Sequence, residues 1–397
     1  MEPKRVIFLS LMICYVGFGI INPVLAPLIR EMGLEERHAG WIVSASALVM
    51  LFVAPVWGRQ SDRFGRKPVM MIGLLGFAFS LSLFALLAWL GMQGTIPLTL
   101  LFVMLLISRM LFGLFVPALT SSGQALMADL TSLSERSAGM AMIGAASGIG
   151  FLIGPAMGAA LSGIHLVFPI GVAAMLSLLT VLLVYKRIPR LTPKTGIGRS
   201  SISLRKPGMR PYLTTALCLM SVMVMLQVTA GFYVQDKFGL DAKDTAMWVG
   251  IGLLSIGLAM ALVQMAILRK RSFPPRALLR IGLPIFAVGL LLLVSIDHLA
   301  GFVLSFVLLG IGGGFAIPGY TAGVSMAAGE ERQGAAAGLT AAATGLGALA
   351  APIAGTELYR IQPEVPYWIA ILVIVALTAY VWSSHRGLLG TMNHSKT

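Results

Sequence analysis

Charged residues are scarce in this chain, and acidic ones are the scarcest. Of 397 residues, only 11% are Asp, Glu, Lys or Arg, and 15 are acidic. Soluble domains carry about 25% charged residues. The chain is instead 57% hydrophobic. Because single soluble cores stop growing near ~250–300 residues, one core does not absorb this much apolar sequence, and the composition excludes a soluble globular protein.

Long apolar runs account for the excess. Runs of about 20 residues match the ~30 Å thickness of the hydrocarbon core of a bilayer. We therefore predict an all-α membrane protein with twelve transmembrane helices, at residues 6–29, 38–57, 69–91, 97–127, 137–161, 163–185, 211–235, 243–268, 277–296, 299–328, 334–357 and 366–384. An even number of spans places both termini on the same side of the membrane.

The basic residues indicate which side that is. If both termini are cytoplasmic, 23 of the 29 Lys and Arg residues lie on the cytoplasmic side, 5 lie on the other side, and Arg109 lies within a span. This asymmetry follows the positive-inside rule and predicts cytoplasmic termini. The net charge of +14 is thereby assigned to loops near lipid headgroups, so membrane lipids are expected partners and nucleic acid is not.

Cysteine is also scarce, and catalytic motifs are missing. Cys14 and Cys218 lie far apart in apolar runs, the five His residues are isolated, and no P-loop, Ser-His-Asp grouping or HExxH motif occurs. We therefore expect no enzyme activity, no metal site and no cofactor. An ATP-driven pump or an intramembrane hydrolase is disfavoured on the same ground.

One long polar stretch divides the spans into six and six. It holds eight Lys and Arg residues and no acid. We predict an N-terminal six-helix bundle at 1–185, a basic cytoplasmic linker at 186–210, and a C-terminal six-helix bundle with a short tail at 211–397.

An internal repeat agrees with this division. Phe112–Thr120 parallels Gly313–Thr321, and Pro155–Gly158 parallels Pro352–Gly355. Spans 4 and 5 therefore look like a copy of spans 10 and 11. Transporters built from parallel repeats bind substrate at the interface between their halves.

A dense charged stretch, residues 58–68, lies between the second and third spans. Glycine permits a tight turn where a Cβ would clash, and Asp62 beside Arg residues can form charge-assisted hydrogen bonds. Five positions fit the pattern G-x-x-x-D-x-x-G-R-[RK], which resembles the loop motif of the major facilitator superfamily: Gly58, Asp62, Gly65, Arg66 and Lys67. The resemblance implies a gating role and a link to an acid at the inner end of span 4, the place of Asp129. The alternative is charge that only sets topology.

Arg109 stands in the middle of span 4. A central Arg costs about 2.5–3.5 kcal/mol on insertion scales, so it should face a cavity or a partner. The sequence R-x-x-x-G here resembles the superfamily motif associated with proton coupling. A structural Arg held by carbonyls and waters is the alternative.

Span 5 carries small residues at helical spacing. Gly150, Gly154, Pro155 and Gly158 resemble G-x-x-x-G-P-x-x-G, the signature of exporters in the superfamily. Small residues let helices approach closely, and proline kinks the helix. Residues 17–27 resemble the first span of the twelve-span drug:proton antiporters, the tetracycline-exporter type included.

The resemblance implies a secondary active transporter of the bacterial inner membrane. We expect a monomer that exports small amphipathic compounds by alternating access, driven by the proton gradient. By position, the substrate cavity would include Phe18, Asn22, Gln227, Phe315 and Tyr320.

Two alternatives stay open beside this reading. The first is a dedicated exporter of one metabolite, such as a siderophore or a sugar, and the second is a non-transporting membrane sensor. No acidic residue lies in the middle of any span, which leaves Asp62, Asp129, Asp236 and Arg109 as candidates for carrying or relaying the proton.

Overall fold

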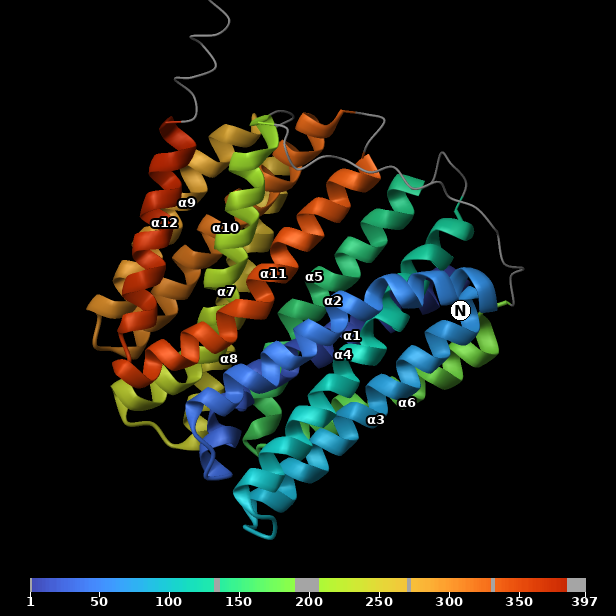
Figure 1. Cartoon of the computed structure of the whole chain (residues 1–397), viewed down its shortest axis with the longest axis horizontal. Helices are drawn as coiled ribbons and strands as arrows, with labels where there is room; N and C mark the ends of the chain where they lie inside the picture. Colours follow the sequence, from blue (N-terminus) through green and yellow to red (C-terminus); the bar gives the residue numbers. More distant parts are fainter. Residues whose placement is uncertain (1, 132–135, 190–206, 270–272, 330–332, 384–397) are drawn as a thin grey trace, which may run out of the picture. The chain divides into compact units, whose positions relative to one another are not determined.

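The computed structural model describes residues 2–131, 136–189, 207–269, 273–329 and 333–383 (Figure 1). Within them, twelve helices are long and apolar enough to cross a membrane. They are α1 (Pro3–Glu31), α2 (Glu36–Phe64), α3 (Arg66–Met92), α4 (Leu98–Asp129), α5 (Arg136–Ser162), α6 (Phe168–Arg187), α7 (Arg210–Phe238), α8 (Ala242–Arg269), α9 (Pro275–Ser295), α10 (Leu299–Ala328), α11 (Gln333–Ile361) and α12 (Val365–Ser383). The predicted fold class and number of spans are confirmed.

The junction between the second and third helices differs from the prediction. Helix α2 continues to Phe64, α3 begins at Arg66, and Gly65 alone forms the turn, with φ of 95°. Gly58 lies inside α2, where a Cβ would meet nothing within 4 Å, so its assignment to a tight turn was wrong. No proline follows Gly58 before residue 68, and one glycine costs a helix only about 1 kcal/mol, so the polar end of α2 stays helical.

The predicted linker lies mostly outside the described residues, which omit 190–206. Its first two residues end α6, and a short 3-10 turn (Pro207–Met209) precedes α7. By contacts, the chain forms two compact units, and the predicted division into two bundles and a linker stays a prediction. We call Met1–Ile197, Gln227–Leu254 and Pro352–Arg360 the first unit, and Gly198–Leu226, Ser255–Ala351 and Ile361–Thr397 the second unit.

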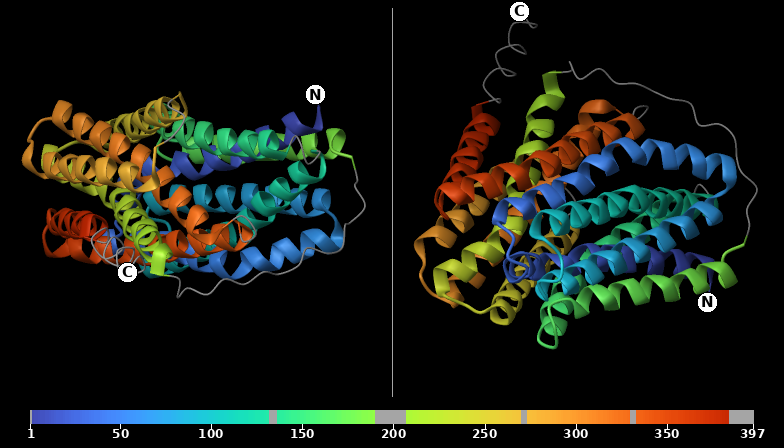
Figure 2. Two further views of the ribbon diagram at one scale, coloured as in Figure 1. Left: turned by 90° about the horizontal axis from the view of Figure 1, so that it is seen from above. Right: turned by 60° about the horizontal axis from the view of Figure 1, so that its bottom comes forward.

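Packing inside the two units follows the internal repeat. In the first unit α3 packs on α4 and α6, and in the second α9 packs on α10 and α12. Figure 2 shows the blue to green helices of the first unit alongside one another. A Cβ at Gly113 of α4 would lie 3.0 Å from the Cα of Ser46 on α2, and a Cβ at Gly314 of α10 would lie 3.1 Å from the Cα of Met260 on α8. Each contact needs a residue without a side chain.

The glycines of α5 face α1. A Cβ at Gly154 would lie 2.7 Å from the carbonyl oxygen of Val16 and 2.9 Å from the Cα of Gly19. In the other direction, a Cβ at Gly19 would lie 2.8 Å from Cδ of Pro155. These are contacts with backbone and a proline ring, which cannot move aside as a flexible side chain can. The close contact predicted for span 5 therefore exists, and its partner is α1.

Gly154→Leu should destabilise the protein, because it forces a side chain into this backbone contact, and overpacking costs about 1–3 kcal/mol. The measurement is the midpoint of thermal unfolding in detergent. Gly148→Leu is the matched control, since Gly148 lies on the same helix with nothing within 4 Å of an added Cβ. Equal unfolding midpoints for the two variants would contradict the close packing of α5 on α1.

Candidate functional site

One arginine ties together three helices at the junction of α2 and α3. Arg66, the first residue of α3, forms an ion pair with Asp62 in the last turn of α2. Its Nε lies 3.2 Å from Oδ2 of Asp129, the last residue of α4. Its Nη1 also donates to Ser61 Oγ at 3.2 Å. The structure thus brings together Asp62, Arg66 and Asp129, the three charged residues that the loop motif and span 4 placed in one group.

Lys67 belongs to a different contact. Its Nζ donates to the carbonyl oxygens of Tyr185 at 2.8 Å and Ile188 at 2.6 Å. Both carbonyls lie at the C-terminal end of α6, where the last backbone acceptors lack partners inside the helix. Lys67 therefore caps α6, an interaction that also suits the negative end of the helix dipole.

Arg109 is buried in α4, with 7% of its surface exposed. Its guanidinium lies 4.3 Å from the ring centre of Phe112 and 5.7 Å from that of Phe84. Both distances are within the range of cation–π attraction. Among the described residues, its buried Nη1 has no hydrogen-bond partner. A buried cation held by two rings, with a donor to spare, suits the binding of a polar or anionic group.

Aromatic side chains connect Arg109 to α1. The ring of Phe18 meets that of Phe112 edge to face, with 4.8 Å between centres. Tyr15, one turn earlier, lies 5.2 Å from Phe151 of α5. Tyr15, Phe18 and Asn22 are only half-buried, while most of α1 around them is buried. Phe18 and Asn22, both predicted to line the cavity, therefore share a half-buried stripe of α1, and Phe18 reaches Arg109 through the ring of Phe112.

The other predicted cavity residues are distributed over both units. Gln227 lies in the first unit and is half-buried. Phe315 and Tyr320 lie in the second, where Phe315 is half-buried and Tyr320 is 4% exposed. A cavity shared by all of them remains a prediction.

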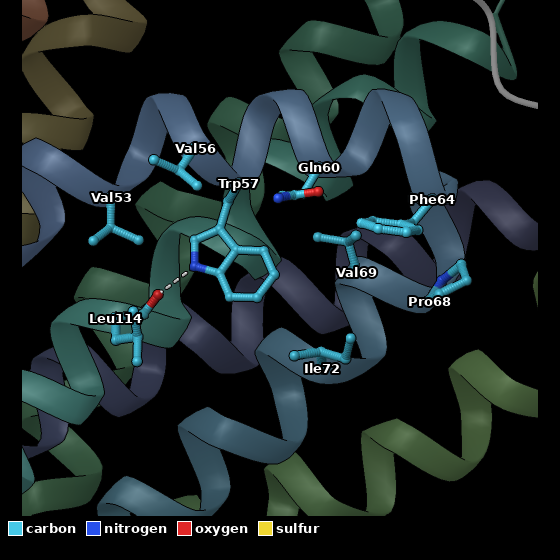
Figure 3. Close-up of a pocket in the computed structure, with 9 residues that line it drawn as sticks. All are labelled: Val53, Val56, Trp57, Gln60, Phe64, Pro68, Val69, Ile72 and Leu114. Atoms are coloured by element: carbon cyan, nitrogen blue, oxygen red, sulfur yellow. Dashed lines mark hydrogen bonds between the residues drawn. The ribbon is translucent and has the colours of Figure 1, made fainter.

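An apolar groove of about 420 Å³ lies beside the junction of α2 and α3, within the first unit (Figure 3). Trp57 stands at its centre and donates its indole N–H to the carbonyl oxygen of Leu114 at 2.7 Å. Prolines in a helix free the backbone carbonyl four residues earlier, but Leu114 is three residues before Pro117, so this bond does not replace one lost to proline. Instead it fixes the end of α2 on α4, next to the Arg66 contacts.

A second charged group, which sequence reasoning did not assemble, surrounds Arg30 in the last turn of α1. Arg30 donates to Asp236 of α7 through both terminal nitrogens, Nη1 to Oδ1 at 2.6 Å and Nη2 to Oδ2 at 2.8 Å. It also donates to Glu36, the first residue of α2, at 2.8 Å. Tyr359 of α11 donates its hydroxyl to Asp236, and the Arg30 guanidinium lies 5.3 Å from the Phe232 ring centre. All five residues belong to the first unit.

A looser ring of charges adjoins this group. Glu35 forms ion pairs with Arg37 at 2.9 Å and with Arg360 at 3.7 Å, and Arg360 also pairs with Glu357 at 3.3 Å. These side chains are 41–48% exposed, so each pair contributes little to stability. In the part of the chain that the structure describes, no group of three or more His, Cys, Asp or Glu side chains is placed to hold a metal ion.

Known proteins resemble the chain over almost its whole length. It is 28% identical to multidrug resistance protein 1 of Bacillus subtilis over 95% of this chain and 97% of that protein. It is 28% identical to the class D tetracycline resistance protein of Salmonella ordonez, over 89% of this chain and 88% of that protein.

A solved structure shares the fold at low identity. It is the structure of a bacterial homologue of the human lysosomal transporter Spinster in an inward-facing, unoccupied conformation. The match covers 98% of this chain and 97% of that chain, with a TM-score of 0.76 and 12% sequence identity. A model described as Major Facilitator Superfamily matches residues 7–272 and 251–387, nearly the entire sequence. The chain therefore belongs to the Major Facilitator Superfamily, whose members are membrane transporters rather than enzymes.

Proposed function

We propose that the chain exports small amphipathic compounds, drugs among them, across the bacterial inner membrane in exchange for protons. The observation that carries this proposal is full-length similarity to proteins named for multidrug and tetracycline resistance. The glycine contact between α5 and α1 supports it, because the exporter-type motif forms a real helix interface here. The protein acts as a monomer with both termini in the cytoplasm, so the junction of α2 and α3 faces inward.

Asp62, Arg66 and Asp129 form the inner gate in this proposal. The Arg66 guanidinium is 13% exposed and holds two carboxylates, of which Asp62 is 54% exposed and Asp129 is 20% exposed. Asp62 is therefore the partner that water can most readily replace when α2 moves. Because Asp129 stays with Arg66, the arginine is not left without a counter-charge as the gate opens.

Arg109 couples the proton to the substrate. Its open donor and its aromatic neighbours adjoin the half-buried stripe of Phe18 and Asn22, where an amphipathic molecule has both rings and polar groups to contact. A neutral, planar drug could stack on these rings, and a carboxylate or a hydroxyl could accept from the guanidinium.

Proton-driven export should be observed with the purified protein. In proteoliposomes, an imposed pH gradient should drive accumulation of several members of a panel comprising tetracycline, a quinolone and a lipophilic cation dye. Substrate flux and lumenal pH are recorded together. Transport of one compound class alone would favour the dedicated-exporter alternative, and no gradient-driven flux of any compound would contradict the proposal.

Asp62→Asn should lower the export rate roughly tenfold while leaving expression near wild type, since a charge-assisted bond contributes about 1.5–3 kcal/mol and the exposed Asp62 contributes little to folding. Arg59→Gln is the matched control, because Arg59 is an exposed charge at the same end of α2. The measurement is the initial export rate of each variant in vesicles. A wild-type rate for Asp62→Asn would remove this contact from the gate.

Arg109→Lys should be impaired, because Lys keeps the charge but loses the planar fork that lies against two rings. Arg109→Ala should lose gradient-driven accumulation more than substrate affinity. Both are measured in one preparation, with affinity in detergent and flux in vesicles. Lost affinity together with intact coupling would instead place Arg109 in the substrate site.

A further inference from the structure

The group around Arg30 contains more acidic than basic side chains. One guanidinium serves two carboxylates, Glu36 and Asp236, and all three side chains are only 25–38% exposed. Tyr359 adds a neutral donor to Asp236. Two ionised acids and one base carry a net charge of −1, so the group becomes electrically neutral when it accepts one proton.

The two carboxylates are not equivalent. Glu36 and Arg30 are six residues apart, and the turn from α1 to α2 keeps them together whatever α7 does. Asp236 is 206 residues from Arg30, and its contacts with Arg30 and Tyr359 connect the ends of α1, α7 and α11. Asp236 is also the more exposed acid, at 38% against 25% for Glu36. Loss of the Asp236 contacts therefore removes the ion pair between α1 and α7 and leaves Arg30 paired with Glu36. The uncharged contacts of Arg30 with α7 remain, namely the hydrogen bond to Gln235 at 3.2 Å and the Phe232 ring.

We propose that Asp236 is a positioning residue through which external protons act on export, because its bond to Arg30 is the latch that closes the outer ends of α1 and α7. This rests on the proposed function, which places these ends on the outer side. When a proton from the external solution binds the Asp236 carboxylate, the bidentate ion pair is replaced by at most a hydrogen bond from the charged guanidinium to an uncharged carboxylic acid. Arg30 retains Glu36, and no charge is left unpaired. Since the proton and the ion pair exclude each other, acid favours the open outer end.

Other titratable groups lie at the same end. On α1 and α2 they are Glu31, Glu35, Arg37 and His38, on α11 Glu357, Tyr359 and Arg360, and on α7 and α8 Lys237, Lys243, Asp241 and Asp244. His38 is the obvious competitor, because histidine ordinarily titrates between pH 5 and 8. His38 accepts from the backbone N–H of Glu35 and packs on Phe102, and so belongs to the cap of α2.

The test is the initial export rate of tetracycline in proteoliposomes as a function of absolute pH, with the pH difference across the membrane held constant. The wild-type rate should change by about threefold or more as the external pH falls to about 4 and below, because an ion-paired carboxyl binds its proton only below its ordinary range. Asp236→Asn, which imitates the protonated acid, should give a flat profile with unchanged tetracycline affinity in detergent. Asp236→Glu should restore the pH dependence.

Two further variants separate the latch from its surroundings. Glu36→Gln should move the profile to lower pH, because a proton on Asp236 would then leave Arg30 without a counter-charge. His38→Gln should retain the wild-type profile. A pH-dependent rate in Asp236→Asn that matches wild type, or a flat profile in His38→Gln, would overturn the proposal.

A measurement without transport distinguishes failure of the latch from failure of the proposed function. In detergent, the unfolding midpoint of the wild type should exceed that of Asp236→Asn, and the difference should shrink as pH falls and the ion pair is lost. A difference that is constant with pH would reject the latch even if transport is proton-driven. If the wild type shows no gradient-driven flux but the difference does shrink, the export proposal fails and the pH-sensitive contact stands.

Discussion

At both ends of α2, each half-buried arginine keeps a carboxylate partner, because an unpaired half-buried charge costs more than most single contacts contribute. The two ends of α2 meet this constraint in the same way. Glu36 begins the helix and shares Arg30 with Asp236, while Asp62 near its other end shares Arg66 with Asp129. Since α2 has 29 residues, its two ends lie roughly 40 Å apart.

Because two carboxylates share one arginine, the helix that carries one of them can move away at a lower electrostatic cost. In each group one carboxylate is held close to the arginine, and the other can leave without stranding a charge. In the proposed mechanism, the exposed Asp62 is the partner that leaves at the inner end, and Asp236 is the partner that leaves at the outer end. Between them, the backbone contacts of Gly154 with α1 do not depend on charge. The first unit therefore has a rigid middle and, in this account, exchangeable contacts at both ends of α2.

Much of this was predictable from local sequence. Twelve apolar runs fixed the spans, because backbone polar groups in hydrocarbon must be satisfied within helices. The register of the loop motif placed Asp62, Arg66 and Asp129 together, and glycine spacing identified the close face of α5.

The extension of α2 past Gly58 was missed. The apolar run ends where the polar residues begin, but the helix continues through them. The group around Arg30 was missed because its members are up to 329 residues apart, as Arg30 and Tyr359 show, and hydropathy carries no information on which helix ends meet.

The most direct test of the account is the distance between the ends of α1 and α7 as a function of pH. Spin labels on Glu31→Cys and Asp241→Cys, both exposed positions flanking the Arg30 group, report it by double electron–electron resonance in a background lacking Cys14 and Cys218. The account predicts a longer distance at acidic than at mildly alkaline pH, and a pH-independent long distance when Asp236→Asn is added. An identical distance at both pH values in the labelled protein with Asp236 intact would contradict it.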